Sequence, residues 1–197
     1  MLSSVIRVQS VRDHRAVHPT CEARSQAAGF TLIELMTVVI IMGVLAALAT
    51  YGVRKYLLEA KKAEAVSMLT QIRATEETYR DETFNFLGAA DFNTWHPTNT
   101  PGGKRYGWAS TTTTMKTNVF DPLGVLPDGP VEYSYAVVAG TVGTSIPTIP
   151  GTFGLTFPTP TGPFYIAMAK GDLNNDGKFT YAICQSDTTA IAVEDGF

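Results

Sequence analysis

Hydrophobic and polar positions divide the N-terminal part of the chain sharply. A polar stretch that carries arginines covers residues 1–29, and a nearly uninterrupted apolar run extends from Phe30 to about Val53. Apolar runs of about 18 residues or more predict a membrane-spanning helix. Glu34 is a carboxylate inside this run. A charge at such a depth costs roughly 2–4 kcal/mol on insertion scales, so Glu34 is a candidate functional residue.

From residue 54 to about residue 84 the pattern is that of an amphipathic helix. No glycine or proline interrupts the chain between Val53 and Gly88. We therefore predict one continuous helix from Phe30 to Phe84, about 80 Å long at 1.5 Å per residue, with an apolar stripe packed on a globular head. The stripe is too short for a coiled-coil stalk. Its members are Val53, Tyr56, Leu57, Ala60, Ala65, Met68, Leu69, Ile72, Thr75 and Tyr79.

The start of the apolar run carries a specific motif, which reads Gly29-Phe30-Thr31-Leu32-Ile33-Glu34-Leu35-Met36. With the apolar helix behind it, the motif resembles the prepilin motif of type IV pilins and type II secretion pseudopilins. The resemblance implies that a prepilin peptidase removes residues 1–29 as a leader by cutting between Gly29 and Phe30, and that it N-methylates Phe30. Glycine before the cut suits a protease that needs close backbone approach. The alternative for this stretch is a disordered cytoplasmic tail.

The resemblance also assigns roles within the apolar helix. Glu34 would attract the terminal amine of a neighbouring subunit during assembly; the alternative is a hydrated carboxylate at headgroup depth. The small residues that begin at Gly43 would let helices approach closely. Gly43 and Gly52 weaken the helix modestly. Most family members carry a proline about where Tyr51 stands, so nothing in this sequence predicts the family's proline-linked kink.

The remainder, residues 85–197, reads as a globular β head. Residues 85–130 are rich in Gly, Pro, Asn and Thr and predict a long, partly ordered loop, which either forms subunit contacts or covers the surface around two anchoring tryptophans. Four segments with strand patterns follow, and their short links favour a small antiparallel sheet covered by the long helix. The expected fold class is therefore α+β and pilin-like. The strand segments are 132–138, 163–169, 178–184 and 189–193.

A cluster of oxygen side chains lies between two of these segments. Asp172, Asn174 and Asp176 alternate before Gly177, as at the start of a calcium loop. Position twelve of an EF-hand would be Ile183 here, which offers no oxygen ligand. The same residues favour a hairpin turn. Calcium is thus the one cofactor that the sequence suggests, beside the simpler turn interpretation.

Charge and composition narrow the function classes. The formal net charge is −3, residues 1–29 carry +2, and the remainder is therefore about −5, which argues against a nucleic-acid partner. Removal of the leader would take Cys21 and leave Cys184 without a disulfide partner. It would also leave His96 as the only histidine, with no second His or Cys pair for a zinc site. We expect no enzyme.

The expected function is a structural subunit of a type IV pilus or pilus-like filament. Its partners by resemblance are copies of itself, the prepilin peptidase, an assembly platform with a separate ATPase, and the inner membrane. The head would lie outside the cytoplasm, and the assembled filament would be extracellular. A minor pilin or secretion pseudopilin is the alternative within the class. A membrane-anchored binding protein or adhesin that never polymerises is the rival from a different class.

Overall fold

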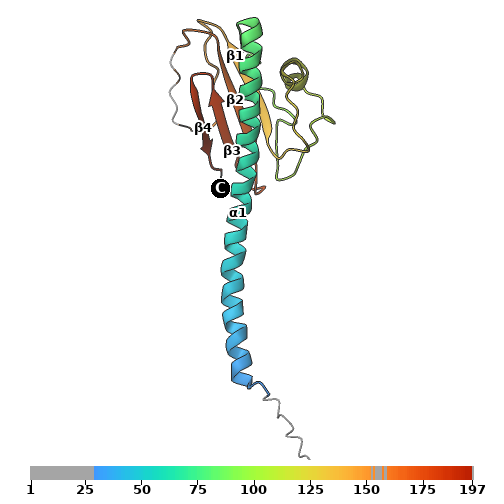
Figure 1. The fold of residues 1–197 in the computed structure, drawn as a ribbon, viewed down its shortest axis with the longest axis vertical. Helices are drawn as coiled ribbons and strands as arrows, with labels where there is room; N and C mark the ends of the chain where they lie inside the picture. Colours follow the sequence, from blue (N-terminus) through green and yellow to red (C-terminus); the bar gives the residue numbers. More distant parts are fainter. Residues whose placement is uncertain (1–28, 152, 154–156, 158, 197) are drawn as a thin grey trace, which may run out of the picture. The chain divides into compact units, whose positions relative to one another are not determined.

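The computed structural model describes residues 29–151, 153, 157 and 159–196. The predicted leader therefore lies outside the described residues, except for Gly29. The chain forms two compact units, Met1–Leu45 and Ala46–Phe197, and helix α1 (Leu32–Thr83) runs from the first into the second. Within the second unit α1 passes across the sheet formed by strands β1 to β4 (Figure 1).

Helix α1 begins and ends within two residues of the predicted bounds. It is continuous through Thr50-Tyr51-Gly52, where the family's proline is missing. At its C-terminal end Phe84 takes a left-handed conformation (φ 61°), and its N–H donates to the carbonyl of Arg80 at 2.8 Å. A left-handed residue stops an α-helix, and a bulky side chain seldom adopts this conformation. The helix ends here although the sequence carries no glycine at this point.

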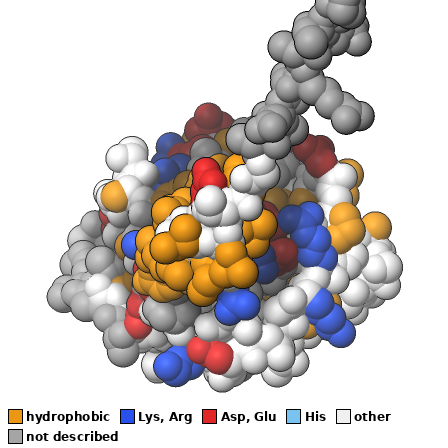
Figure 2. All heavy atoms as spheres, turned by 90° about the horizontal axis from the view of Figure 1, so that it is seen from below, with side chains coloured by type: hydrophobic (Ala, Val, Ile, Leu, Met, Phe, Trp, Pro, Cys, Tyr) orange, Lys and Arg blue, Asp and Glu red, His pale blue; other side chains and the backbone are white. Residues whose placement is uncertain are grey.

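The N-terminal half of α1 exposes its apolar side chains. Figure 2 shows hydrophobic side chains gathered around the near end of the helix. The exposure continues past the apolar run, because Tyr56 and Leu57 are also exposed and packing on the head is extensive only from Ala65 onward. The N-terminal part of the predicted stripe is therefore not covered by the head.

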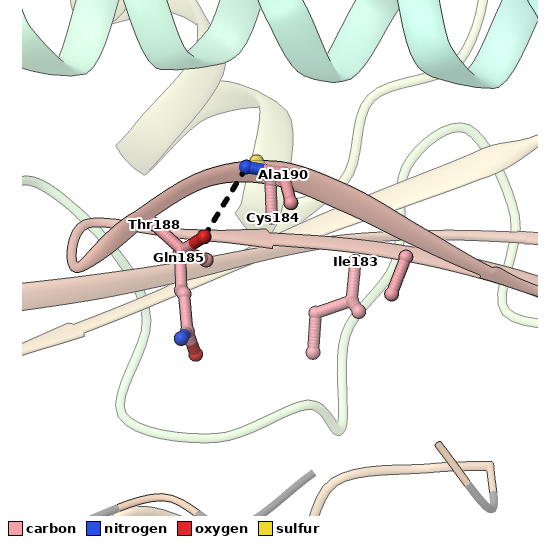
Figure 3. A pocket seen from close by; sticks show the side chains of 6 residues that line it. Ile183, Cys184, Gln185, Thr188 and Ala190 are labelled. Atoms are coloured by element: carbon pink, nitrogen blue, oxygen red, sulfur yellow. Dashed lines mark hydrogen bonds between the residues drawn. The ribbon is translucent and has the colours of Figure 1, made fainter. Parts of the chain in front are cut away.

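Four strands form one antiparallel sheet, as predicted. Their order in the sheet is β1-β2-β3-β4. Their bounds are Ser134–Gly140 (β1), Phe164–Gly171 (β2), Thr180–Gln185 (β3) and Thr188–Glu194 (β4). The pairing of β3 with β4 shifts register between Ile183 and Gln185. In Figure 3, Ile183 and Gln185 point to one side of β3 and Cys184 points to the other. This alternation is the usual two-residue period of a strand.

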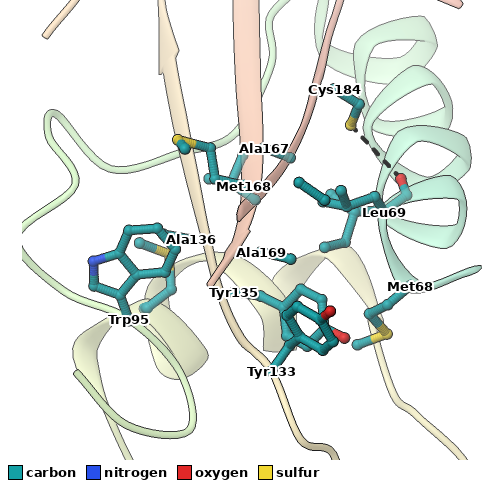
Figure 4. Packing of buried hydrophobic residues seen from close by; sticks show 14 of the residues in the cluster. Met68, Leu69, Trp95, Tyr133, Tyr135, Ala136, Ala167, Met168, Ala169 and Cys184 are labelled. Atoms are coloured by element: carbon teal, nitrogen blue, oxygen red, sulfur yellow. Dashed lines mark hydrogen bonds between the residues drawn. The ribbon is translucent and has the colours of Figure 1, made fainter. Parts of the chain in front are cut away.

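One part of the core lies between α1 and the sheet, which confirms the predicted α+β fold, and another part lies on the opposite face of the sheet, on the side of Trp95 (Figure 4). Met68 and Leu69 of α1 pack toward Tyr135 and Ala169 of the sheet, and all four are buried. The Cys184 thiol donates to the carbonyl of Leu69 at 3.8 Å, so it behaves as a buried small residue. Packing of one helical stripe on one sheet face is what stabilises a sheet this small.

Residues 85–130 have more regular structure than the predicted loop. Ala89 bridges Val138 in parallel and His96 bridges Tyr135 in antiparallel fashion, so the segment extends the sheet beside β1. It also contains a π-helical turn, η1 (Lys116–Phe120), followed by a short helical turn, α2 (Asp121–Leu123). Trp95 lies on the side of the sheet away from α1 (Figure 4). Trp95 and Trp108 are both buried, as expected of anchoring residues.

Candidate functional site

The predicted processing and assembly residues lie at the very start of α1. The Glu34 N–H donates to the Thr31 hydroxyl at 3.2 Å, and the Leu35 N–H donates to the Thr31 carbonyl at 3.2 Å. Thr31 is therefore the N-cap of the helix, and Glu34 is its third residue. Thr-x-x-Glu is the signature of a capping box, in which each side chain satisfies a free backbone N–H of the first turn. The sequence contained this signal, and the prediction did not use it.

The cap gives Glu34 a local role beside the predicted one. A carboxylate in the first turn interacts favourably with the positive end of the helix dipole, typically by about 0.3–1 kcal/mol. Glu34 is exposed, and its carbonyl accepts the hydroxyl of Thr37 at 2.9 Å. The backbone of Glu34 is thus fixed in the first turn of the helix, and its carboxylate stays accessible to a partner. Helix capping and intermolecular pairing are compatible here.

Phe30 and the apolar half of α1 expose a surface that water does not favour. Phe30 is 81% exposed, and the large apolar residues from Leu32 to Val53 are exposed as well. Among the described residues, α1 is the helix that is long and apolar enough to cross a membrane. Exposed apolar patches far larger than a few hundred Å² mark contact with lipid or with other proteins. This half of the helix requires such an environment.

Gly43 and Gly52 have open surroundings within the chain. A Cβ atom added at either position would meet nothing within 4 Å beyond the helix itself. Packing within this chain therefore does not require glycine at these positions. If their small size serves close helix packing, as predicted, the neighbour must come from another molecule.

The Asp172–Gly177 loop forms the hairpin between β2 and β3. Asp172 is nearly buried, and its carboxylate accepts the N–H groups of Asp176 at 3.2 Å and Gly177 at 3.0 Å. Asp176 accepts the N–H of Lys178 at 2.8 Å and the side-chain amide of Asn174 at 3.0 Å. These hydrogen bonds lower the pKa of Asp176. The turn is held by its own side chains, and calcium binding stays a prediction.

His96 is enclosed by its own segment. Its ring lies edge-on to Trp108 at 4.3 Å between centroids, and its Nδ1 is 3.0 Å from the Thr113 hydroxyl. Burial lowers the pKa of His96 to about 4, so the imidazole is neutral at physiological pH. These contacts give His96 a packing role. Within the described residues no three His, Cys, Asp or Glu side chains form a group that could hold a metal ion.

A cavity of about 240 Å³ lies at the β3–β4 hairpin (Figure 3). It is lined by Ile183, Cys184, Gln185, Thr188, Ala190 and Ala192. The Ala190 N–H donates to the Thr188 hydroxyl at 3.2 Å across its rim. Burial raises the pKa of the Cys184 thiol to about 11, so the group stays protonated and unreactive. The six lining residues form no acid–base or nucleophile–base pair.

Residues 24–50 match a family model described as the prokaryotic N-terminal methylation motif. The match contains Gly29, Phe30 and Glu34 together with the cap and most of the exposed apolar helix. No curated protein matches the chain, and no solved structure does.

Proposed function

We propose that the chain is a structural subunit of a type IV pilus or pilus-like filament, because residues 24–50 match the N-terminal methylation motif that marks the type IV pilin and pseudopilin family. One observation carries the proposal. The motif lies at the start of a helix whose first half exposes apolar side chains and whose second half packs on a folded sheet. Members of this family are generally structural proteins rather than enzymes.

We propose that the processed subunit is first held in the inner membrane and is then assembled into the filament. A prepilin peptidase cuts between Gly29 and Phe30 and methylates the new terminal amine. The apolar half of α1 first stays in the inner membrane with the head outside the cytoplasm, and then enters the core of an extracellular filament. Its apolar surface exchanges lipid for neighbouring helices, so the hydrophobic burial changes little. An assembly platform and a separate ATPase supply the work.

Glu34 is the proposed electrostatic partner of an incoming subunit. In the low-dielectric core of a filament an isolated carboxylate is penalised, and the terminal ammonium of a neighbour offsets much of that penalty. The capping geometry supports this role because it fixes the backbone of Glu34 in the first turn of the helix, where the side chain is exposed.

A comparison of Glu34→Gln with Thr31→Ala separates charge pairing from helix capping. Gln at position 34 leaves the hydrogen bond from its own N–H to the Thr31 hydroxyl in place but has no charge, whereas Thr31→Ala weakens the cap and keeps the carboxylate. We expect Glu34→Gln to be processed normally and to yield few filaments, and Thr31→Ala to assemble. Filaments from Glu34→Gln at the wild-type level would rule out the pairing role.

Mass spectrometry of surface filaments sheared from cells tests the function itself. We expect an abundant, N-methylated peptide that starts at Phe30, and Gly29→Val should abolish it. A processed Phe30 terminus confined to membranes would instead indicate a minor pilin or a secretion pseudopilin. An intact leader on a protein that stays in the membrane would favour the anchored binding protein or adhesin.

A further inference from the structure

A groove of about 450 Å³ lies between α1 and the chain around Leu126–Val131. Its polar lining is dominated by oxygen atoms, from Glu64 on the helix, Asp128 on the rim and Tyr135 of β1, together with Gln71. Met68 and Leu126 give it apolar walls. The groove belongs wholly to the head and to the part of α1 that packs on it.

The groove contains a polar group that is unpaired in the described part of the chain, the Tyr135 hydroxyl, in addition to its carboxylates. Tyr135 is fully buried, lines the groove, and has no hydrogen-bond partner for its hydroxyl among the described residues. Glu64 is tied on one side, because its Oε1 accepts the N–H of Glu132 at 2.7 Å. Its Oε2 forms an ion pair with the exposed Arg105 guanidinium at 3.9 Å, a separation too long for a hydrogen bond. A hydroxyl and a carboxylate oxygen are thus left to accept further hydrogen bonds.

These features fit an ammonium group on an apolar stem. An ammonium donates three hydrogen bonds and accepts none, which matches a site rich in acceptors. The apolar walls would cover the methylene stem of a lysine, which is how long charged side chains commonly pack. A metal ion fits less well, since the described residues provide no group of three His, Cys, Asp or Glu here.

Lys55 is the lysine of this chain best placed to serve as that ligand. It is exposed, and no hydrogen bond, ion pair or aromatic contact involves it within the described part of the chain. Lys178 is also exposed, but it lies close enough to Asp176 to lower that carboxyl's pKa. The other described lysines contact acidic, carbonyl or aromatic groups of their own chain.

The helix geometry places Lys55 and the groove on different sides of α1. Lys55 precedes Glu64 by nine residues, which at about 100° per residue is a half-turn around the axis and about 14 Å along it. Lys55 therefore points away from the groove of its own chain. Two parallel copies with a stagger of about 14 Å could place Lys55 of one beside the groove of the next. A contact between two different surfaces of identical chains propagates into a filament.

We propose that this groove receives the Lys55 ammonium of a neighbouring copy of the chain, between Asp128, Glu64 and the Tyr135 hydroxyl. The contact rests on the proposed filament function and adds a specific junction between heads to it. It would fix the stagger of adjacent subunits through a charge pair outside the apolar core.

Charge reversal in the full-length chain tests the junction. Lys55→Glu and Asp128→Lys should each lower the yield of sheared filaments by roughly tenfold, because each places like charges together. The double variant should restore most of the yield. Lys178→Glu is the matched control, since it reverses another exposed lysine outside the groove, and it should assemble normally. Asp128 lies exposed on the groove's rim, so its replacement should leave the head folded.

Zero-length carbodiimide cross-linking of wild-type filaments gives an independent measurement. It should join Lys55 of one subunit to Asp128 or Glu64 of another, and mass spectrometry would identify the linked peptides. Wild-type yields from both single variants, or a Lys55→Glu defect that Asp128→Lys fails to rescue, would overturn the junction and leave the filament function intact. Absence of filaments from the wild-type chain would overturn both.

Discussion

Glu76 accepts a hydrogen bond from the backbone N–H of Leu87 at 3.0 Å, which ties α1 to the chain that follows it. Glu76 lies outside the exposed apolar half of α1, on the face that packs on the sheet, and it is 0% exposed. Its other carboxylate oxygen has no hydrogen-bond partner among the described residues. Burial raises the pKa of Glu76 to about 8, and the nearby charge of Glu77 acts in the same direction. The folded chain therefore favours the protonated acid.

Glu76→Gln should stabilise the head in a pH-dependent way. Between the ordinary pKa of 4.5 and about 8, the unfolded chain has lost this proton and the folded chain keeps it. The contribution of Glu76 to stability is therefore full below pH 4.5 and declines as pH rises to about 8. Gln accepts the same N–H and never ionises. We expect its melting temperature to exceed the wild-type value by about 5 °C or more at pH 8, with the difference vanishing near pH 4.5.

Thermal unfolding of the full chain in detergent between pH 4.5 and 8.5 measures this difference. Glu82→Gln is the control, because Glu82 is an exposed carboxylate near the end of the same helix and is not among the groups that shift the pKa of Glu76. A Glu76→Gln advantage that does not change with pH would mean that the carboxylate does not hold its proton in the folded state.

Arg73 fastens the β3–β4 hairpin to the helix. Its guanidinium donates to the carbonyls of Thr189 at 2.7 Å and Thr188 at 3.2 Å. Arg73→Ala should cost about 1–3 kcal/mol, and Arg73→Lys should recover only part of it, since a single ammonium cannot reproduce the planar fork. Arg80→Ala, which removes an exposed ion pair, should cost less than about 1 kcal/mol. Chemical denaturation gives these values, and equal losses for the three variants would contradict this role for Arg73.

Gly88 lies against β1 where the chain leaves the helix. A Cβ at this position would overlap the backbone nitrogen of Ala139 and lie 2.7 Å from the Val138 carbonyl carbon. Gly88→Ala should therefore weaken docking of the following segment by about 1–3 kcal/mol. Gly162→Ala meets nothing within 4 Å and should be nearly neutral. Limited proteolysis should detect faster cleavage in residues 85–100 of Gly88→Ala only.

The Asp172–Gly177 loop should fold without calcium. Because both Asp172 oxygens already accept backbone N–H groups, Asp172→Ala should lower stability by about 1–2 kcal/mol even with a chelator present. We expect the wild-type melting temperature to be the same in calcium and in chelator. A calcium-dependent rise that Asp176→Asn removes would instead establish the predicted site.

Most of the fold could be predicted from local sequence patterns. The helix followed from its spacing and from the absence of proline, and the strand segments were placed to within about two residues. Glu76 is absent from the predicted stripe because that stripe was built from apolar and small residues, although Glu76 follows Ile72 by four residues on the buried face of α1. An apolar residue at that position would have been predicted correctly. Only the packed structure reveals that a carboxyl group lies there.

The segment beside β1 could not be predicted, because its order depends on distant contacts. Ala89 and His96 bridge Val138 and Tyr135, more than 35 residues along the chain, and no local periodicity encodes such pairing. The groove depends in the same way on Glu64, Asp128 and Tyr135 meeting from three separate elements. The N-terminal motif, in contrast, could be recognised from the sequence because its residues are contiguous. The helix cap likewise depends only on residues close together in the chain.

The burial of Trp95 and Trp108 has a practical consequence. The chain contains two tryptophans, both in the segment beside β1, where they are 4% and 3% exposed. The Lys170 ammonium lies 5.1 Å from the Trp95 ring, and the His96 ring is in contact with Trp108. Intrinsic tryptophan fluorescence will therefore report on this segment and hardly at all on the helix. The chain therefore carries a label-free optical probe of whether its head stays folded.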